Sequence, residues 1–222
     1  MSAFQIRISR RSFLQAAGLT ALAGGLAACG STAQSTAPSA SAPAYSLEDA
    51  VKAEFTESGI TLSPENASGC TVEGTALTIA AAGTYAVSGS CADGSIQIRK
   101  GTEDVTLVLN GLTLTSTTTA PLVCGKSSGV TLAAAEGTEN TLTDGEANNK
   151  DNANASEDAE SAVVKCKDGS QVVLCGTGTL NLHAVGKNGI KSGTTEEDRD
   201  PSLPTRPLRL TIDAPVYNAI TA

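Results

Sequence analysis

Two stretches of this chain share one pattern: Ala120–Leu132 reads APLVCGKSSGVTL, and Ser161–Leu174 reads SAVVKCKDGSQVVL. Each opens with a small residue followed by aliphatic ones, passes through a turn containing Gly and Ser, and closes on a second aliphatic run. Short apolar runs between turn residues are typical of β-strands. The repetition predicts that the chain passes more than once through the same order of strand, turn and strand.

Outward from these stretches, the same texture continues from Ile60 to the end of the chain. Apolar residues alternate with Thr or Ser between Gly and Asn, as in DVTLVLNGLTLTS and QVVLCGTGTLNLHAVG. Such period-two alternation predicts strands. One short helix is expected over Tyr45–Phe55, where Leu47, Val51 and Phe55 recur at four-residue steps. The fold class predicted by this pattern is all-β.

The spacing of the repeats favours a parallel β-helix. The aliphatic anchors Leu122, Val163, Ile190 and Ile220 are about 30 to 40 residues apart, and polar insertions near 144–160 and 194–206 account for part of that length. About twenty residues, forming three short strands with turns, suffice for one turn of such a solenoid, and insertions leave through the turns.

An antiparallel β-sandwich is the alternative. It requires tight two-residue hairpins, and Asn-Gly pairs occur at Asn110–Gly111 and Asn188–Gly189. In either architecture, we expect Val108 and Leu174 to point into the interior.

The N-terminal segment predicts export and anchoring. The stretch SRRSFLQAAGLTALAGGLAACG carries Arg10 and Arg11 before a short apolar run, as twin-arginine export signals do. The ending Leu26–Cys29 is similar to a lipobox, in which Cys29 becomes the lipidated first residue of the mature protein. The Ser-, Thr-, Ala- and Pro-rich stretch 30–44 is typical of a flexible tether. The mature protein is therefore expected on the outer face of a cell membrane.

Charge and cysteine content exclude several kinds of site. The whole chain carries a formal charge of −8, and loss of the signal would remove three arginines and no acid. A nucleic-acid partner is not expected, because it requires a basic footprint. The five remaining cysteines contain no C-x-x-C pair and the chain has one histidine, so a zinc site is not expected either. We expect these cysteines to be buried in the core, with no more than one bridge and at least one free thiol.

Three strings, in the order DVTLVLNG (Asp104–Gly111), EGTENTLTDG (Glu136–Gly145) and NGIKS (Asn188–Ser192), resemble a family of bacterial surface proteins described as carbohydrate-binding domains. The resemblance covers Ile60–Ala222. It implies a right-handed, single-stranded parallel β-helix like that of pectate lyases, and binding of pectic acid or cellulose with bound calcium. Relatives often carry further aspartates where this chain has only Asp168 and where it has Lys187 before Asn188. They also continue past YNAITA, so this copy is expected to be short.

Calcium ligands are expected in the acidic insertion that follows EGTENTLTDG. Six carboxylates and four asparagines lie between Thr141 and Val164, and calcium takes six to eight oxygen ligands from such groups. We expect Asp144, Asp158 and Glu160, at the ends of the insertion near strands, to contribute together with Asn188. The middle, Asn148–Ala155, is expected to contribute less, because a solvated loop is the usual fate of such a run.

No catalytic constellation stands out. His183 is expected on the outer surface of a strand, and the chain has no nucleophile elbow. A calcium-dependent polysaccharide lyase remains the second hypothesis, with Arg199, Arg206 or Arg209 as a base, and a structural or adhesive protein is the third. The sequence therefore predicts an export signal (1–28), a lipidated cysteine and linker (29–58), and a non-enzymatic, polysaccharide-binding β-domain (59–222).

Overall fold

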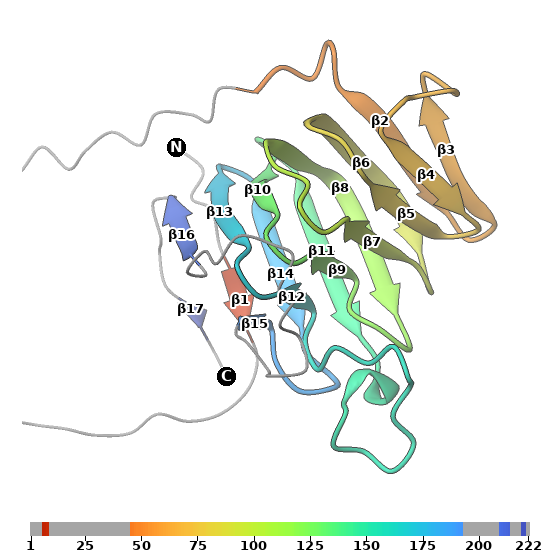
Figure 1. Cartoon of the computed structure of the whole chain (residues 1–222), viewed down its shortest axis with the longest axis vertical. Coiled ribbons are helices and arrows are strands. Elements are labelled where there is room, and N and C mark those ends of the chain that lie inside the picture. The colour runs from red at the N-terminus through yellow and green to blue at the C-terminus, as the bar shows by residue number, and fades with distance from the viewer. Residues whose placement is uncertain (1–5, 9–44, 193–208, 214–218, 221–222) are drawn as a thin grey trace, which may run out of the picture.

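The computed structural model describes residues 6–8, 45–192, 209–213 and 219–220, and side-chain positions are described for 45–192 (Figure 1). Within these residues the fold is all-β, and its only helical element is one turn of 3-10 helix, η1 (Glu146–Asn148). The strands are β1 (Ile6–Ile8), β2 (Val51–Thr56), β3 (Gly59–Ser63), β4 (Cys70–Glu73), β5 (Ala76–Ile79), β6 (Gly83–Cys91), β7 (Ser95–Ile98), β8 (Val105–Ser116), β9 (Leu122–Cys124), β10 (Gly129–Ala134), β11 (Glu139–Asp144), β12 (Val164–Cys166), β13 (Gln171–Gly176), β14 (Thr179–His183), β15 (Ile190–Ser192), β16 (Arg209–Asp213) and β17 (Ala219–Ile220).

The strands form two sheets. The small sheet has six strands in the order β15-β12-β9-β7-β5-β4, and the large sheet has eleven, with β13-β10-β8-β11-β14 at its centre. Neighbouring strands are parallel except at two antiparallel hairpins, β2–β3 and β4–β5. These hairpins lie at the end of the molecule where the described part of the domain begins (Figure 1). The sheets are therefore mixed, with a predominantly parallel interior.

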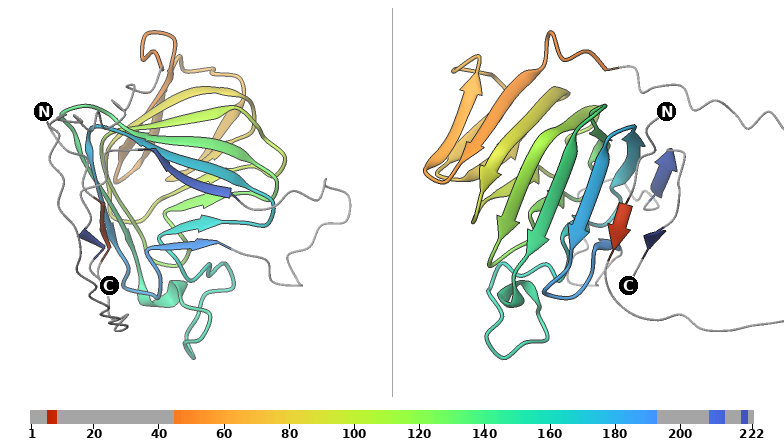
Figure 2. Two further views of the ribbon diagram at one scale, coloured as in Figure 1. Left: turned by 90° about the vertical axis from the view of Figure 1, so that its left-hand side faces the viewer. Right: turned by 180° about the vertical axis from the view of Figure 1, so that it is seen from behind.

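The chain visits the sheets in a repeating order. It passes through β7 and then β8, through β9, β10 and β11, and through β12, β13 and β14, each time entering the small sheet first. The long strand β8 pairs with β10 through its first half and with β11 through its second half. Successive passages lie side by side along the molecule (Figure 2). Each passage therefore stacks in parallel on the one before.

The interior is filled by alternate residues of every strand. Leu107 and Leu109 of β8 and Leu174 of β13 are at most 1% exposed and belong to one continuous apolar core. The expected inward position of Leu174 is confirmed. Val108 is also buried, but it points the other way, as period-two geometry between Leu107 and Leu109 requires. It belongs to a second, smaller apolar cluster with Ala133, Ala135 and Cys175.

That second cluster is covered by the segment preceding the first large strand. Tyr45 and Leu47 pack against the outer apolar patch that contains Val108. The helix predicted over Tyr45–Phe55 is wrong, because Val51–Thr56 forms strand β2 and pairs with both β3 and β6. Its four-residue recurrence of apolar side chains arises from an extended chain, in which Ala53 and Phe55 face the core.

A buried asparagine holds one corner of the large sheet together. Asn140 is 0% exposed, and its Oδ1 accepts hydrogen bonds from the backbone N–H of Gly111 (2.9 Å) and Leu112 (3.0 Å). Its Nδ2 donates to Thr138 Oγ1 (3.0 Å) and to the carbonyl of Thr179 (3.1 Å). Asn140 therefore connects the passages before and after its own.

The Asn110–Gly111 pair lies within strand β8, at this corner. Gly111 has a φ of +80°, a conformation that glycine adopts without steric cost. All the neighbours of β8 are parallel to it, so this Asn-Gly pair bends a strand and does not form the hairpin that a sandwich would require. No helix among the described residues is long and apolar enough to cross a membrane.

Candidate functional site

The acidic insertion between β11 and β12, residues 145–163, is a folded loop. It begins with η1 and continues through hydrogen-bonded turns, with Ser156 N–H donating to the carbonyl of Ala147 (2.8 Å) and Asn152 Nδ2 donating to the carbonyl of Glu146 (2.9 Å). The loop projects from the end of the large sheet beyond β11 (Figure 1). Its backbone polar groups are thus paired largely within the loop, as an ordered loop requires.

Asn148 is the centre of this loop. Its side chain is 0% exposed, and Oδ1 accepts hydrogen bonds from the backbone N–H of Glu160 (2.6 Å) and Ser161 (3.3 Å). Nδ2 donates to Asp144 Oδ2 (2.9 Å) and to the carbonyl of Ala162 (2.8 Å). The expectation that Asn148 belongs to a solvated middle of the loop is wrong, because this amide joins both ends of the insertion.

Asp144 is buried and is used by the protein itself. Only 1% exposed, its Oδ1 accepts hydrogen bonds from the backbone N–H of Val185 (2.7 Å) and Gly186 (3.0 Å), while Oδ2 accepts from Asn148. Both N–H groups belong to the corner after β14, in the next passage of the chain. The carboxylate therefore fixes the insertion to that corner, and three hydrogen bonds compensate for its burial.

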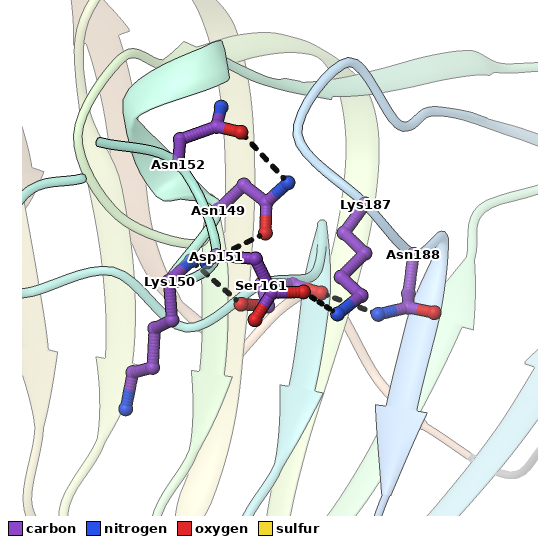
Figure 3. Close-up of polar contacts among 7 residues, drawn as sticks. All are labelled: Asn149, Lys150, Asp151, Asn152, Ser161, Lys187 and Asn188. Carbon is purple, nitrogen blue, oxygen red and sulfur yellow. Dashed lines mark hydrogen bonds and ion pairs between the residues drawn. The ribbon is translucent and has the colours of Figure 1, made fainter. Parts of the chain in front are cut away.

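The outer part of the insertion contacts the same corner through a second set of bonds (Figure 3). Lys187 Nζ pairs with Asp151 Oδ2, and Asn188 Nδ2 donates to the carbonyl of Ser161 (2.7 Å). Ser161 Oγ in turn accepts from the N–H of Lys150 (3.0 Å). The Lys187 ammonium, by hydrogen bond and charge, lowers the pKa of Asp151 below its ordinary value. Asn188, one of the four expected calcium ligands, therefore joins the corner after β14 to the insertion.

The remaining two expected ligands lie on the other side of the loop. Glu160 Oε1 forms an ion pair with Lys167 Nζ at 2.5 Å, whereas the Asp158 side chain is exposed. Within the described residues, no group of three or more His, Cys, Asp or Glu side chains is placed to hold a metal ion. The carboxylates of Asp144 and Glu160 have partners within the protein in this structure.

A polar groove of about 490 Å³ lies between this side of the insertion and the outer face of the small sheet. Such a volume is within the range of ligand sites. Its floor comes from β7 and β9, and its wall from the insertion and from the residue following β12. The lining residues are Ser95, Gln97, Thr119, Val123, Lys150, Glu157, Asp158, Ala159, Glu160 and Lys167.

Positive charge gathers along the small sheet. Nine Lys and Arg residues lie between 45 and 192. Eight of them lie on small-sheet strands, within a few residues of those strands, or in the insertion, and the ninth, Lys52, lies on β2. The eight are Arg99, Lys100, Lys126, Lys150, Lys165, Lys167, Lys187 and Lys191. Of these eight, Lys150 and Lys167 line the groove, together with the carboxylates of Glu157, Asp158 and Glu160.

The groups considered for catalysis do not converge on the groove. His183 is exposed on the large sheet, as expected, and does not line the groove. Arg199 and Arg206 lie outside the described residues, as do Arg10, Arg11 and Cys29. Arg209 begins strand β16, and its side chain is likewise outside the described part. The five cysteines from Cys70 to Cys175 are buried thiols in this structure.

Sequence reasoning missed the groove because its walls come from segments that are far apart in the chain. Gln97 and Lys167 are seventy residues apart, and no local spacing relates them. One signal was available, namely that basic residues recur at the ends of β7, β9 and β12, as in IRK, CGK and CKD. Asn148 had no comparable signal, since three other asparagines stand within six residues of it.

Comparison with known proteins gives consistent matches. The family model described as "Carbohydrate-binding domain-containing protein" matches residues 73–195. A protein of that description from Acetivibrio thermocellus is 30% identical over 134 residues, which are 60% of this chain and 45% of the relative. The chain thus spans less than half the length of that relative.

A solved structure is similar as well. It is described as the polysaccharide lyase-like protein from C. thermocellum, as a gadolinium derivative. It aligns with a TM-score of 0.53 and 27% sequence identity, over 64% of this chain and 56% of that protein. The similarity in sequence and in fold therefore extends over more than half of this chain.

Proposed function

The chain belongs to the family of carbohydrate-binding domain-containing proteins, and from that premise we propose that it binds a polysaccharide in the groove between the small sheet and the insertion. The observation that carries the proposal is the groove itself, which is polar and open and is walled by an ordered loop. An extended glycan chain needs such an open surface. The names of the relative and of the similar structure agree with this ligand class.

We take an acidic glycan as the first ligand class to test and a neutral one as the second. The lining carries both signs of charge: Lys150 and Lys167 lie beside Glu157, Asp158 and Glu160, and Lys167 is paired with Glu160. Gln97 and Ser95 supply hydrogen-bonding groups for hydroxyls. The aromatic side chains on which neutral sugars commonly stack are missing from the lining residues. The Lys150 ammonium makes no ion pair among the described residues, so it is ready for a ligand carboxylate. Pectic acid is therefore the first ligand to test, and cellulose the second.

Calcium dependence remains a separate proposal, supported by the family resemblance and by the exposed carboxylates of Glu157 and Asp158. Asp144 and Glu160 are committed to other partners. No step of the binding proposed here is routed through the metal. A chelator arm in the binding experiment tests calcium by itself.

Two further proposals concern fold and location. The recurring order of small-sheet and large-sheet strands, with parallel pairing between passages, supports a right-handed single-stranded parallel β-helix. The pairs Arg10–Arg11 and Ala28–Cys29 support twin-arginine export and a lipid anchor on the extracellular face of the membrane. Retention of the Cys29→Ala variant in the membrane fraction would contradict the anchor.

The test of function is binding of the full chain to immobilised pectic acid and cellulose, with and without chelator. We expect Lys150→Ala and Lys167→Ala to weaken pectic-acid binding by about tenfold each, since each removes one charged contact. Lys52→Ala is the matched control, because it removes the same charge on β2, outside the groove lining. Equal loss from all three variants would show nonspecific charge attraction and contradict the groove.

A polysaccharide lyase is the second candidate, and the name of the similar structure favours it. Incubating the protein with polygalacturonate and following the absorbance of an unsaturated product distinguishes a lyase from a protein that only binds the polysaccharide. We expect no product at enzyme-to-substrate ratios at which binding saturates. Product formation that is lost in Lys167→Ala would replace the binding proposal with a lyase.

A further inference from the structure

Cys124 and Cys166 form a pair in the core of the small sheet. Strands β9 and β12 are parallel neighbours, and Cys124 is the register partner of Cys166. Both side chains are 0% exposed and belong to the apolar core. No other pair of neighbouring strands among the described residues places two cysteines opposite each other.

The other cysteines have different neighbours. Cys70 is opposite Ile79, Cys91 is opposite Leu114, and Cys175 is opposite Ala133. Among the cysteines of the described residues, Cys124 and Cys166 are therefore the pair placed for a bond. Register partners on neighbouring strands are about 4.8 Å apart at Cα, which lies within the range that disulfides span.

We infer that Cys124 and Cys166 form a disulfide when the protein is exposed to an oxidising medium, and that this bond connects the two passages that flank the acidic insertion. The reagent is a small-molecule or protein disulfide. One thiolate of the pair attacks it to give a mixed disulfide and one reagent thiol. The second thiolate then displaces the other reagent thiol, so two protein thiols are oxidised and one reagent disulfide is reduced to two thiols.

The neighbouring Cys124 thiol lowers the pKa of Cys166, and the Cys166 thiol together with burial raises that of Cys124. The product is the same whichever sulfur attacks first. Because neither thiol is exposed, the reagent gains access only when the strands separate locally or before the chain has folded. The reaction on folded protein is therefore expected to be slow and to accelerate in mild denaturant.

The bond would act on the site as well as on the core. Val123 and Lys165, which precede the two cysteines, are also register partners and face the other side of the sheet. Val123 lines the groove. The loop closed by the bond contains the whole insertion, so the bond restrains the unfolded chain over a long segment. This inference does not depend on the proposed function, because it concerns only these two strands.

The experiment uses the full chain, purified in reductant and then incubated with oxidised glutathione. Samples are alkylated in denaturant, digested with trypsin and analysed by mass spectrometry. Trypsin cuts after Lys100, Lys126, Lys165 and Lys167, so residues 101–126 and 166–167 are separate peptides with one cysteine each. We expect these two peptides to be joined, with a melting temperature about 5–10 °C above that of the reduced protein.

Cys91→Ala is the matched control, since it removes a buried thiol without touching the pair, and it should keep both the linked peptide and the rise in melting temperature. Cys166→Ala should lose both. If Cys166→Ala does not fold, the peptide map of the parent chain decides alone. Full alkylation of Cys124 and Cys166 after oxidation, stable glutathione adducts on either one, or a link to another cysteine would each overturn the inference.

Discussion

Two buried asparagines, Asn140 and Asn148, make equivalent sets of hydrogen bonds in two different regions. Each is 0% exposed, and each accepts two backbone N–H bonds through Oδ1 and donates twice through Nδ2. The partners of Asn140 lie at the corner between the two halves of the large sheet. Those of Asn148 lie in the insertion and at its two ends. One amide therefore supports the stacking of the fold, and the other supports the loop that walls the groove.

The difference indicates that fold and site are stabilised by separable networks. A buried amide deprived of its partners leaves N–H and C=O groups without hydrogen bonds, at a cost of about 1–3 kcal/mol each. For Asn140 those groups belong to β8 and to the first residue of β14, which parallel pairing with neighbouring strands holds in place. For Asn148 they are in a loop that can open to solvent.

The largest effect is therefore expected from Asn140→Ala. It leaves the N–H groups of Gly111 and Leu112 and the carbonyl of Thr179 without their partner, and we expect a loss of about 3–5 kcal/mol in the free energy of unfolding. Urea unfolding followed by circular dichroism measures it. Thr113→Ala, an exposed change on the same strand β8 as Leu112, should cost well under 1 kcal/mol. A loss for Asn140→Ala no larger than that of Asn148→Ala would break the comparison.

Asn148→Ala should cost less stability and more function. We expect about 1–3 kcal/mol in unfolding free energy, because the loop opens and water satisfies part of the lost bonds. Limited proteolysis should then cut within 149–160, where the parent resists, and binding of pectic acid should fall at least tenfold. Asn154→Ala is the control, since it changes an exposed asparagine in the same loop. A variant that stays protease-resistant but loses binding would show that Asn148 has no role in ordering the loop.

The sequence predicted the part of this molecule that rests on periodicity. Alternation identified most strands from Ala76 onward and placed Leu174 inside, because every second side chain of a strand faces the same way. The prediction that Val108 points inward is wrong, although its side chain is buried. Its burial comes from Tyr45 and Leu47, some sixty residues earlier in the chain, and alternation within β8 cannot reveal a cover supplied from elsewhere.

The candidate site was predictable only in outline. The acidic insertion stood out by composition, and its ends were correctly recognised as lying close to strands. Composition does not show which carboxylates already have partners inside the protein. Asp144 is occupied by two N–H groups from residues 185 and 186, a contact that exists only because successive passages stack in parallel.

Asp144→Asn separates the structural role of this carboxylate from a role in calcium binding. An asparagine can keep one oxygen toward Val185 and Gly186, but its Nδ2 would then face the Nδ2 of Asn148, so two donors meet. We expect a loss of about 1–3 kcal/mol in the free energy of unfolding, measured without metal by urea titration. Calcium ligation by Asp144 predicts something different, namely that added calcium stabilises the parent chain but not the variant.

Asp158→Asn is the matched control for this comparison. It removes the same charge from an exposed position, where the only hydrogen bond of the residue is made by its backbone N–H. If Asp144 has a structural role only, we expect the unfolding free energy of Asp158→Asn to stay within about 0.5 kcal/mol of that of the parent. If calcium raises the melting temperature of the parent and both substitutions abolish that rise, the two residues share a metal site that the hydrogen bonds of Asp144 do not preclude.

The smallest effect concerns the ion pair between Asp151 and Lys187, at the outer contact of the insertion. The pair lowers the pKa of Asp151, so the carboxylate is more acidic in the folded protein than in the unfolded chain. Because the pKa is lowered, the ion pair stabilises the folded loop at pH values above the ordinary carboxyl range, near pH 4. This stabilisation is lost as the pH falls through the pKa of Asp151 in the folded protein. We therefore expect protection of the amide hydrogens of residues 149–152 against exchange to be constant from pH 7 to about pH 5 and to decrease below pH 4.

Asp151→Asn should show the lower protection at every pH, because it removes the charge that titrates, while Asn148 and Asp144 still hold the base of the loop. High salt should reduce protection in the parent toward that of the variant, since both side chains of the pair are substantially exposed and the attraction is screened. The loop also carries Glu146, Glu157, Asp158 and Glu160. If the variant loses protection below pH 4 as steeply as the parent does, other groups govern the loop, and Asp151 contributes only a contact.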